Sequence, residues 1–155
     1  MPVKKYIHYG HTKFEKDMFC PISNRELFTK PNGGLWASPV DAKFGWKDWC
    51  NAEKFRKCKK SNSFTFTLRG NAVVEHIRSV SDLDALPKVK STYELWCQLD
   101  FERLLEIGID AIELHMSEEV FIDGLYPMNT LYHQLYGWDC DSILIMNPDV
   151  VVEVE

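Results

Sequence analysis

The sequence lacks a long apolar segment. No apolar run approaches the ~20 residues that a membrane-spanning helix requires, and residues 1–5 lead into a strand-like segment without the apolar region of a signal peptide. The five cysteines are odd in number, scattered and never spaced as C-x-x-C, which is typical of reduced thiols rather than of a disulfide framework. We therefore expect a cytoplasmic protein without a membrane partner.

Four common catalytic signatures are also absent. The chain contains no G-x-x-x-x-G-K-[ST], G-x-G-x-x-G, G-x-S-x-G or H-E-x-x-H sequence. The usual motifs of ATP chemistry and serine hydrolysis are therefore missing. The spacing of the histidines and cysteines resembles neither a zinc finger nor a catalytic zinc site. We therefore expect no bound metal.

Clustered positive charge is scarce. The formal net charge is −5, which argues against electrostatically driven binding to long nucleic acids. The exception is the basic run 54–60 at the end of an expected helix. We interpret it as a solvated helix end, where cations favour the helix dipole, with a phosphate-contacting surface as the alternative.

The composition is that of a folded protein. The 155 residues are 45% hydrophobic, 13% aromatic and 26% charged, close to globular averages, and the length suits one domain spanning 1–155. Apolar alternation and turn residues predict strands, and cap residues predict helices. The expected strands are 4–9, 35–37, 63–68, 72–77, 109–114, 142–146 and 150–154. The expected helices begin after Ser38-Pro39 (restarting at Gly45), after Ser79 (ending by Pro87), after Asp100 (101–107) and after Asn129 (130–136).

These elements alternate irregularly, without internal repeats or regular βαβ periodicity. The predicted class is α+β, with a mixed, mostly antiparallel sheet and short flanking helices.

Three short segments place polar or aromatic residues at strand edges beside glycines or turns. They are His8-Tyr9-Gly10, Gly34-Leu35-Trp36-Ala37-Ser38 and Asp139-Cys140-Asp141. In this order they resemble the mono-ADP-ribosyltransferases, and Gly108-Ile109-Asp110-Ala111-Ile112 is similar to a strand of small bacterial and phage members. The resemblance implies a sheet split around an extended NAD molecule. It also implies a toxin or phage effector that modifies a protein, with a nucleic-acid acceptor as a further option.

The resemblance also assigns the NAD-binding residues. His8 would hydrogen-bond a ribose, and Gly10, next to Tyr9, would let the backbone approach the nicotinamide amide. Trp36 stands where the family has a tyrosine and would stack on nicotinamide, and Ser38 corresponds to the serine of a second subclass. The tryptophan lacks the tyrosine hydroxyl.

Two carboxylates complete the implied site. Asp141 matches the catalytic carboxylate, and Asp139 forms with it a spaced acidic pair. Cleaving the bond between nicotinamide and ribose passes through an oxocarbenium-like state, which a carboxylate stabilises while a second acid deprotonates the acceptor. Asp in place of the family's Glu shortens the reach by one methylene.

Other readings stay open. With water as acceptor the enzyme would be an NAD glycohydrolase. A non-catalytic binding module would use tryptophans as interface anchors, namely Trp36, Trp46, Trp49 and Trp138. A cysteine- or metal-dependent hydrolase is a third class, although we interpret Cys140 as structural because two adjacent carboxylates raise its pKa. Glu113 and Glu118-Glu119 are reserve carboxylates, interpreted as solvated surface.

Overall fold

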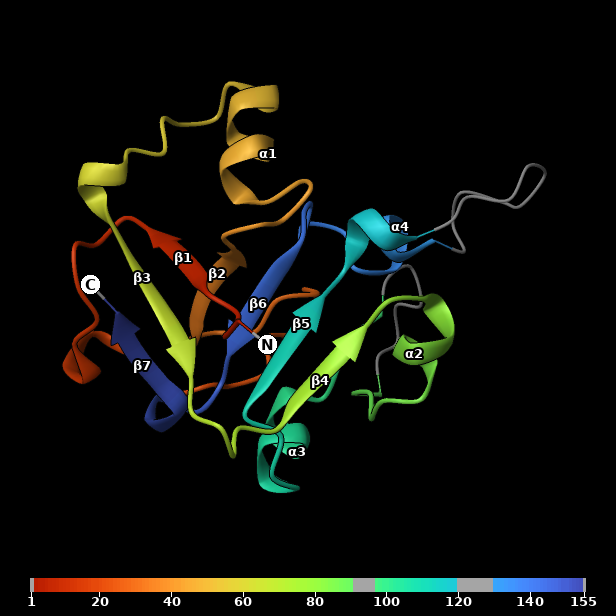
Figure 1. Ribbon diagram of the computed structural model, residues 1–155. Coiled ribbons are helices and arrows are strands. Elements are labelled where there is room, and N and C mark those ends of the chain that lie inside the picture. The colour runs from red at the N-terminus through yellow and green to blue at the C-terminus, as the bar shows by residue number, and fades with distance from the viewer. Residues whose placement is uncertain (1, 91–96, 120–129, 155) are drawn as a thin grey trace.

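The computed structural model describes residues 2–90, 97–119 and 130–154. They form a seven-stranded sheet in the order β4-β5-β6-β2-β1-β3-β7 (Figure 1). Five of the six neighbouring pairs are antiparallel, and β4 and β5 are parallel. The strands are β1 (Tyr6–Tyr9), β2 (Leu35–Pro39), β3 (Ser63–Leu68), β4 (Val74–Ile77), β5 (Ala111–Leu114), β6 (Ser142–Ile145) and β7 (Val151–Val154). The predicted α+β class with a mixed, mostly antiparallel sheet is confirmed.

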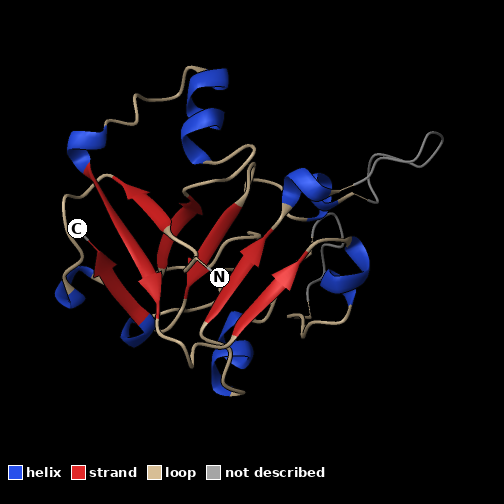
Figure 2. Cartoon of the chain, in the orientation of Figure 1, coloured by secondary structure: helices blue, strands red, loops and turns tan. Residues whose placement is uncertain are grey.

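The helices are short and lie around the rim of the sheet (Figure 2). They are α1 (Trp46–Glu53), α2 (Val80–Asp84), α3 (Phe101–Glu106) and α4 (Leu131–Gln134), with 3₁₀ turns η1 (Lys16–Met18), η2 (Lys60–Asn62), η3 (Met116–Glu118) and η5 (Pro148–Val150). In Figure 1, α1 stands beyond the upper ends of β1 and β2, and α3 lies near the lower ends of β4 and β5. In the described part of the chain, no helix has both the length and the apolar character needed to cross a bilayer.

Side-chain alternation along the strands divides the core between two clusters, because successive residues point to opposite faces of a sheet. In β6, Leu144 packs with helix residues such as Phe101 and Leu131, whereas Ile143 and Ile145 join Phe66 on the other side. The sheet is therefore buried on both faces near its centre.

The sheet loosens between β1 and β2. These strands share only the pairs Tyr6↔Pro39 and Ile7↔Ser38, whereas β1 and β3 are paired along all four residues of β1. Beyond Ile7 the His8 side chain, not the backbone, reaches β2, since its Nδ1 lies 2.6 Å from the carbonyl oxygen of Trp36. A cleft lies at this local separation, lined by residues of both strands.

One predicted helix start is wrong. Ser38 and Pro39 are the last residues of β2, and the helix begins only after Gly45. Proline is tolerated there because β2 pairs with β6 only as far as Ala37, so a missing N–H costs little at the strand end. The Ser38 hydroxyl nevertheless accepts a hydrogen bond from the backbone N–H of Trp46, the first residue of α1, at 2.9 Å. Ser38 therefore supplies a hydrogen-bond acceptor to the first turn of a helix that begins eight residues later.

Other predicted caps are confirmed. The Ser79 hydroxyl accepts from the Asp82 backbone N–H at 3.2 Å, and the Asp100 carboxylate accepts from Arg103 N–H at 3.0 Å. For the last helix the cap is Thr130, one residue after the predicted one, and its hydroxyl accepts from His133 N–H at 3.2 Å. The expected cap Asn129 lies outside the described residues.

Candidate functional site

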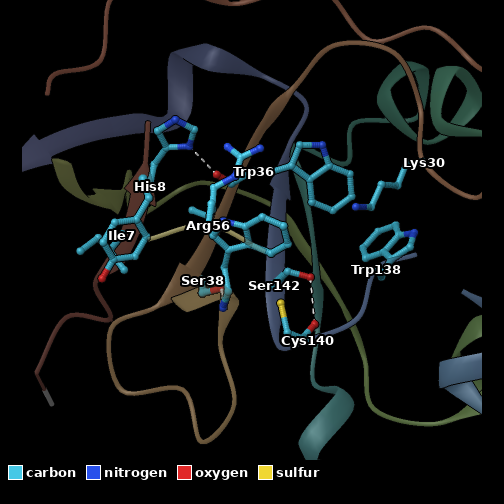
Figure 3. A pocket seen from close by; sticks show the side chains of 12 residues that line it. Ile7, His8, Lys30, Trp36, Ser38, Arg56, Trp138, Cys140 and Ser142 are labelled. Atoms are coloured by element: carbon cyan, nitrogen blue, oxygen red, sulfur yellow. Dashed lines mark hydrogen bonds between the residues drawn. The ribbon is translucent and has the colours of Figure 1, made fainter. Parts of the chain in front are cut away.

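A cleft of about 240 Å³ lies where β1 and β2 separate. Its walls come from both strands, from the segments before β2 and β6, and from α1 and the chain after it (Figure 3). The lining residues are Ile7, His8, Tyr9, Lys30, Trp36, Ala37, Ser38, Trp46, Arg56, Trp138, Cys140 and Ser142. This volume lies a little below the ~300–1,000 Å³ of pockets that enclose a drug-sized ligand, so it suits one part of a larger molecule.

Four of the five residues expected to bind NAD line this cleft: His8, Tyr9, Trp36 and Ser38. The fifth, Gly10, lies just outside the lining at a φ of 122°, and its N–H donates to Asn62 O at 2.8 Å. The residues that the sequence motifs selected therefore lie close together in the fold.

His8 is held by both ring nitrogens. A carbonyl oxygen only accepts, so Nδ1 is protonated and donates to Trp36, and Nε2 accepts from Nδ1 of His11 at 2.9 Å. Burial lowers the pKa of His8, which favours this neutral form. A ligand atom can take over Nε2 by displacing His11, which is exposed.

Ser38 joins three segments beneath the cleft. While its hydroxyl accepts from Trp46 N–H, it donates to the backbone carbonyl of Asp141 at 2.8 Å. The side chain is buried, and both functions of the hydroxyl are used. Ser38 therefore positions the cleft walls, and a ligand meets Ser38 through its surface rather than through a free hydroxyl.

Two indoles form the apolar wall. Trp36 and Trp138 pack edge to face, with ring centroids 4.8 Å apart at 83°. Trp138 is buried, and its Nε1–H donates to Thr29 O at 3.2 Å. The Trp36 ring is partly exposed, which leaves aromatic surface for a planar ligand.

Two cations line the cleft, Lys30 and Arg56. The ammonium of Lys30 lies 5.1 Å from the Trp36 ring centroid, and Figure 3 shows the side chain extending toward the space between the two indoles. Burial lowers the pKa of Lys30, against an opposing effect from Asp139. Arg56 also lines the cleft, although it belongs to the basic run that we interpreted as solvated. The cleft thus combines aromatic surface with positive charge.

Asp139 does not line the cleft, but it lies in sequence between the lining residues Trp138 and Cys140 and is close enough to the lining residue Lys30 to influence its pKa. Its backbone is left-handed, with a φ of 67°, and it is partly exposed. Burial raises the pKa of its carboxyl group, and Lys30 lowers it by a smaller amount. Among the described residues no hydrogen bond engages this carboxylate, so it is available to a ligand.

Asp141 does not line the cleft. Its buried carboxylate accepts from the backbone N–H of Ser117 at 2.7 Å and from the Ser117 hydroxyl at 2.6 Å. Its own N–H donates to Phe44 O at 2.9 Å. Neither of the two predicted catalytic carboxylates lines the cleft. Asp139 is partly exposed beside lining residues, whereas Asp141 is bound within the protein.

The structure agrees with the prediction for Cys140 and contradicts the one for Glu113. Cys140 is buried, and burial, followed by the charge of Asp139, raises its pKa to about 12, which agrees with a structural thiol. Glu113, interpreted as solvated surface, is fully buried, so that interpretation is wrong. It accepts hydrogen bonds from the side chains of Tyr6 and Lys4. These partners are more than 100 positions away in sequence, so no local sequence pattern predicts that Glu113 is buried.

Comparison of the chain with models of known protein families, with curated proteins and with solved structures finds no match.

Proposed function

We propose that the chain binds NAD in the cleft between β1 and β2 and transfers its ADP-ribose to a macromolecule. The observation that carries the proposal is the convergence of His8, Tyr9, Trp36 and Ser38 on one cleft. These residues were selected from their resemblance to mono-ADP-ribosyltransferases and come from two segments that are far apart in sequence. A shared cleft gives that resemblance a physical basis.

The chemistry of the walls supports a dinucleotide. The partly exposed ring of Trp36 offers stacking for nicotinamide or adenine. Arg56 and Lys30 offer cations for the pyrophosphate, and a guanidinium binds phosphate oxygens in a bidentate way. The cleft volume fits one nucleotide half, with the other half extending toward the exposed His11.

Asp139 is the better placed of the two carboxylates to act on a bound ligand. In the proposed reaction the bond between nicotinamide and ribose breaks, neutral nicotinamide leaves with the bonding pair, and the acceptor forms the new bond to the ribose carbon. The acceptor proton passes to a base, and Asp139 can stabilise the cationic ribose or take that proton. Asp141 supports the wall through its backbone carbonyl, which accepts a hydrogen bond from the hydroxyl of Ser38.

The decisive experiment combines NAD binding with nicotinamide release. At NAD concentrations of about 100 times Kd, binding stabilises by about 2.7 kcal/mol, which raises Tm by roughly 5–11 °C in a protein of this size. Labelled NAD and a cell lysate should yield free nicotinamide and a labelled macromolecule. A folded sample whose Tm does not respond to NAD, and which releases no nicotinamide, would overturn the proposal.

Matched variants test the roles of Arg56 and Asp139. Arg56→Ala should weaken NAD binding about 10- to 150-fold, since a hydrogen bond to a charged group contributes about 1.5–3 kcal/mol. Lys57→Ala is its control, because Lys57 belongs to the same basic run, is exposed and does not line the cleft. Asp139→Asn should reduce nicotinamide release about 100-fold or more with little change in NAD affinity.

A cluster of partly exposed aromatics favours one alternative, a protein-binding module. Trp46 and Trp49 stack with centroids 5.1 Å apart, and Phe55, 54% exposed, packs on both. Exposed aromatics beside basic residues are typical of interface anchors. If NAD has no effect and Trp49→Ala abolishes capture of a protein partner, this alternative replaces the transferase. Nicotinamide release without labelled product would instead favour an NAD glycohydrolase.

A further inference from the structure

Two neighbouring strands place three metal-ligand side chains on one face of the sheet. In the parallel pair β4-β5, His76 lies directly opposite Glu113. His115 follows Glu113 by two positions and continues the ladder, because its N–H donates to Ile77 O at 2.9 Å. Residues two apart in an extended segment point to the same side. The three side chains are thus brought together by strand register.

Their ligating atoms converge. His76 Nδ1 lies 2.8 Å from His115 Nε2, and each of these nitrogens lies 3.8 Å from an oxygen of Glu113. All three side chains offer one ligand atom within 4.8 Å of the others. Zn–N bonds of about 2.0–2.1 Å in a tetrahedral site place two nitrogens about 3.3 Å apart. To admit an ion, the two nitrogens must lose the proton of the hydrogen bond that now joins them and separate by about half an ångström.

We propose that His76, Glu113 and His115 bind a divalent transition metal ion, with zinc as the best fit. Two imidazoles and one carboxylate are ligands that zinc accepts, whereas magnesium and calcium prefer oxygen. Three protein ligands leave a fourth position for water, and the His76 side chain, 37% exposed, connects the group to solvent. The site differs from the NAD cleft, which none of the three residues lines.

The surroundings of Glu113 suit a ligand carboxylate. Its side chain is fully buried, and Tyr6 Oη donates to Oε2 at 2.8 Å. Ligating carboxylates are commonly held by such outer hydrogen bonds. On the far side of His115, Nδ1 lies 3.6 Å from Glu118, which can orient the imidazole as carboxylates orient histidine ligands of zinc.

Lys4 is the competing cation. Its ammonium pairs with Glu113 Oε1 and neutralises a charge that would otherwise be buried alone. A metal ion must share the carboxylate with it, so Lys4→Met should strengthen metal binding by removing the repulsion between two cations. If the cluster were only a structural hydrogen-bond network, this substitution would not change metal affinity.

The test titrates the full chain, without a histidine tag and after chelator treatment, with Co²⁺ and then Zn²⁺. We expect one Co²⁺ per chain, visible as d–d absorption and displaced by Zn²⁺, which binds more tightly in the same ligands. His76→Ala should weaken binding about 100-fold or more, since even outer-shell changes cost 10–100-fold. His76 is partly exposed, so this variant should fold, as circular dichroism can verify.

His11→Ala is the matched control. His8 and His11 form a second close pair of imidazoles, with Nε2 and Nδ1 2.9 Å apart, on the exposed side of β1. The proposal requires that His11→Ala keeps the metal affinity. Absence of saturable Co²⁺ binding, or binding that survives His76→Ala in a folded protein, overturns it. NAD binding should be unchanged in His76→Ala, so the metal site and the NAD cleft can fail independently.

Discussion

The carboxylate of Asp141 accepts two hydrogen bonds from Ser117, one from the backbone N–H at 2.7 Å and one from the hydroxyl at 2.6 Å. Ser117 lies in η3, directly after β5, whereas Asp141 precedes β6, so the pair ties together the ends of two adjacent strands. Both carboxylate oxygens are used within the protein. This geometry indicates a structural role for Asp141.

Asp141→Ala should therefore destabilise the protein, because two donors lose a charged acceptor in a buried position. Hydrogen bonds to charged groups contribute about 1.5–3 kcal/mol each, and the two bonds act together, so we expect a loss of about 3 kcal/mol in the free energy of unfolding. Urea denaturation measures it. Ser117→Ala, which removes only the hydroxyl, should cost less. If Asp141→Asn instead keeps the stability and abolishes nicotinamide release, Asp141 is the catalytic carboxylate.

Asp139→Asn should have the opposite effect on stability. Burial raises the pKa of this carboxyl group in the folded state, so stability falls as pH rises from the unfolded-state pKa through the folded-state pKa, and the penalty is fully present at pH 7. The asparagine variant lacks this penalty, and asparagine tolerates the left-handed backbone. We expect the variant to be more stable than the natural chain at pH 7.

The gain should disappear near pH 3, where the carboxyl group is neutral in both states. Urea denaturation at the two pH values checks the difference. An Asp139→Asn variant that is less stable at pH 7 would mean that the carboxylate holds the fold together, and the proposal of an available acid beside the cleft would lose its basis.

His8 should make stability fall in mild acid. Burial lowers its pKa, so between the folded-state and unfolded-state pKa values the unfolded chain binds more protons. Stability is therefore lost as pH falls from about 6.5 toward the folded-state pKa. The His8 ring proton in an NMR titration should report a midpoint below that of an unfolded histidine, and His8→Gln should flatten the dependence of unfolding free energy on pH. A midpoint at or above 6.5 would contradict the buried, neutral ring.

The parts of the fold that the sequence predicted are those fixed by local chemistry. The alternation of Phe64, Thr65 and Phe66 gives β3, and the caps Ser79 and Asp100 mark α2 and α3, because each signal lies within a few residues of its effect. At Ser38 the prediction from neighbouring residues is wrong. The helix-start chemistry is present, but the hydroxyl serves a helix eight residues later while the serine itself lies in a strand.

The residues of the candidate sites also fall into those that local motifs predict and those that only the fold brings together. His8 and Trp36 could be selected because they stand in short motifs at strand edges. Arg56 is covered only by the alternative interpretation of the basic run 54–60 as a phosphate-contacting surface, since it follows α1 in an irregular segment and meets the cleft only through the fold. His76 and Glu113 are also invisible as a pair, because 37 positions separate them and only the parallel register of β4 and β5 brings them together. Spacing rules for metal sites detect ligands that share a turn or a helix, not ligands on paired strands.

Gly34 controls the entry into β2 and thus the position of Trp36. Its φ is 78°, and its N–H donates to Cys20 O at 2.9 Å. A Cβ added there would lie 2.6 Å from Leu144 Cδ1 and 3.1 Å from the backbone oxygen of Ile145. Left-handed strain of about 1–2 kcal/mol combines with an overpacking cost of about 1–3 kcal/mol, so Gly34→Ala should destabilise by roughly 2–5 kcal/mol.

Gly108→Ala separates the two costs. Gly108 also has a positive φ, 98°, as it ends the turn after α3, but a Cβ there meets no atom within 4 Å. Only the backbone strain remains, and we expect a loss of about 1–2 kcal/mol in the free energy of unfolding. Because Gly34 also sets the strand that carries Trp36, Gly34→Ala should weaken NAD binding in the protein that still folds, whereas Gly108→Ala should not. Equal losses of stability in the two variants would show that the core around Leu144 yields, and that β2 is not held by the close approach at Gly34.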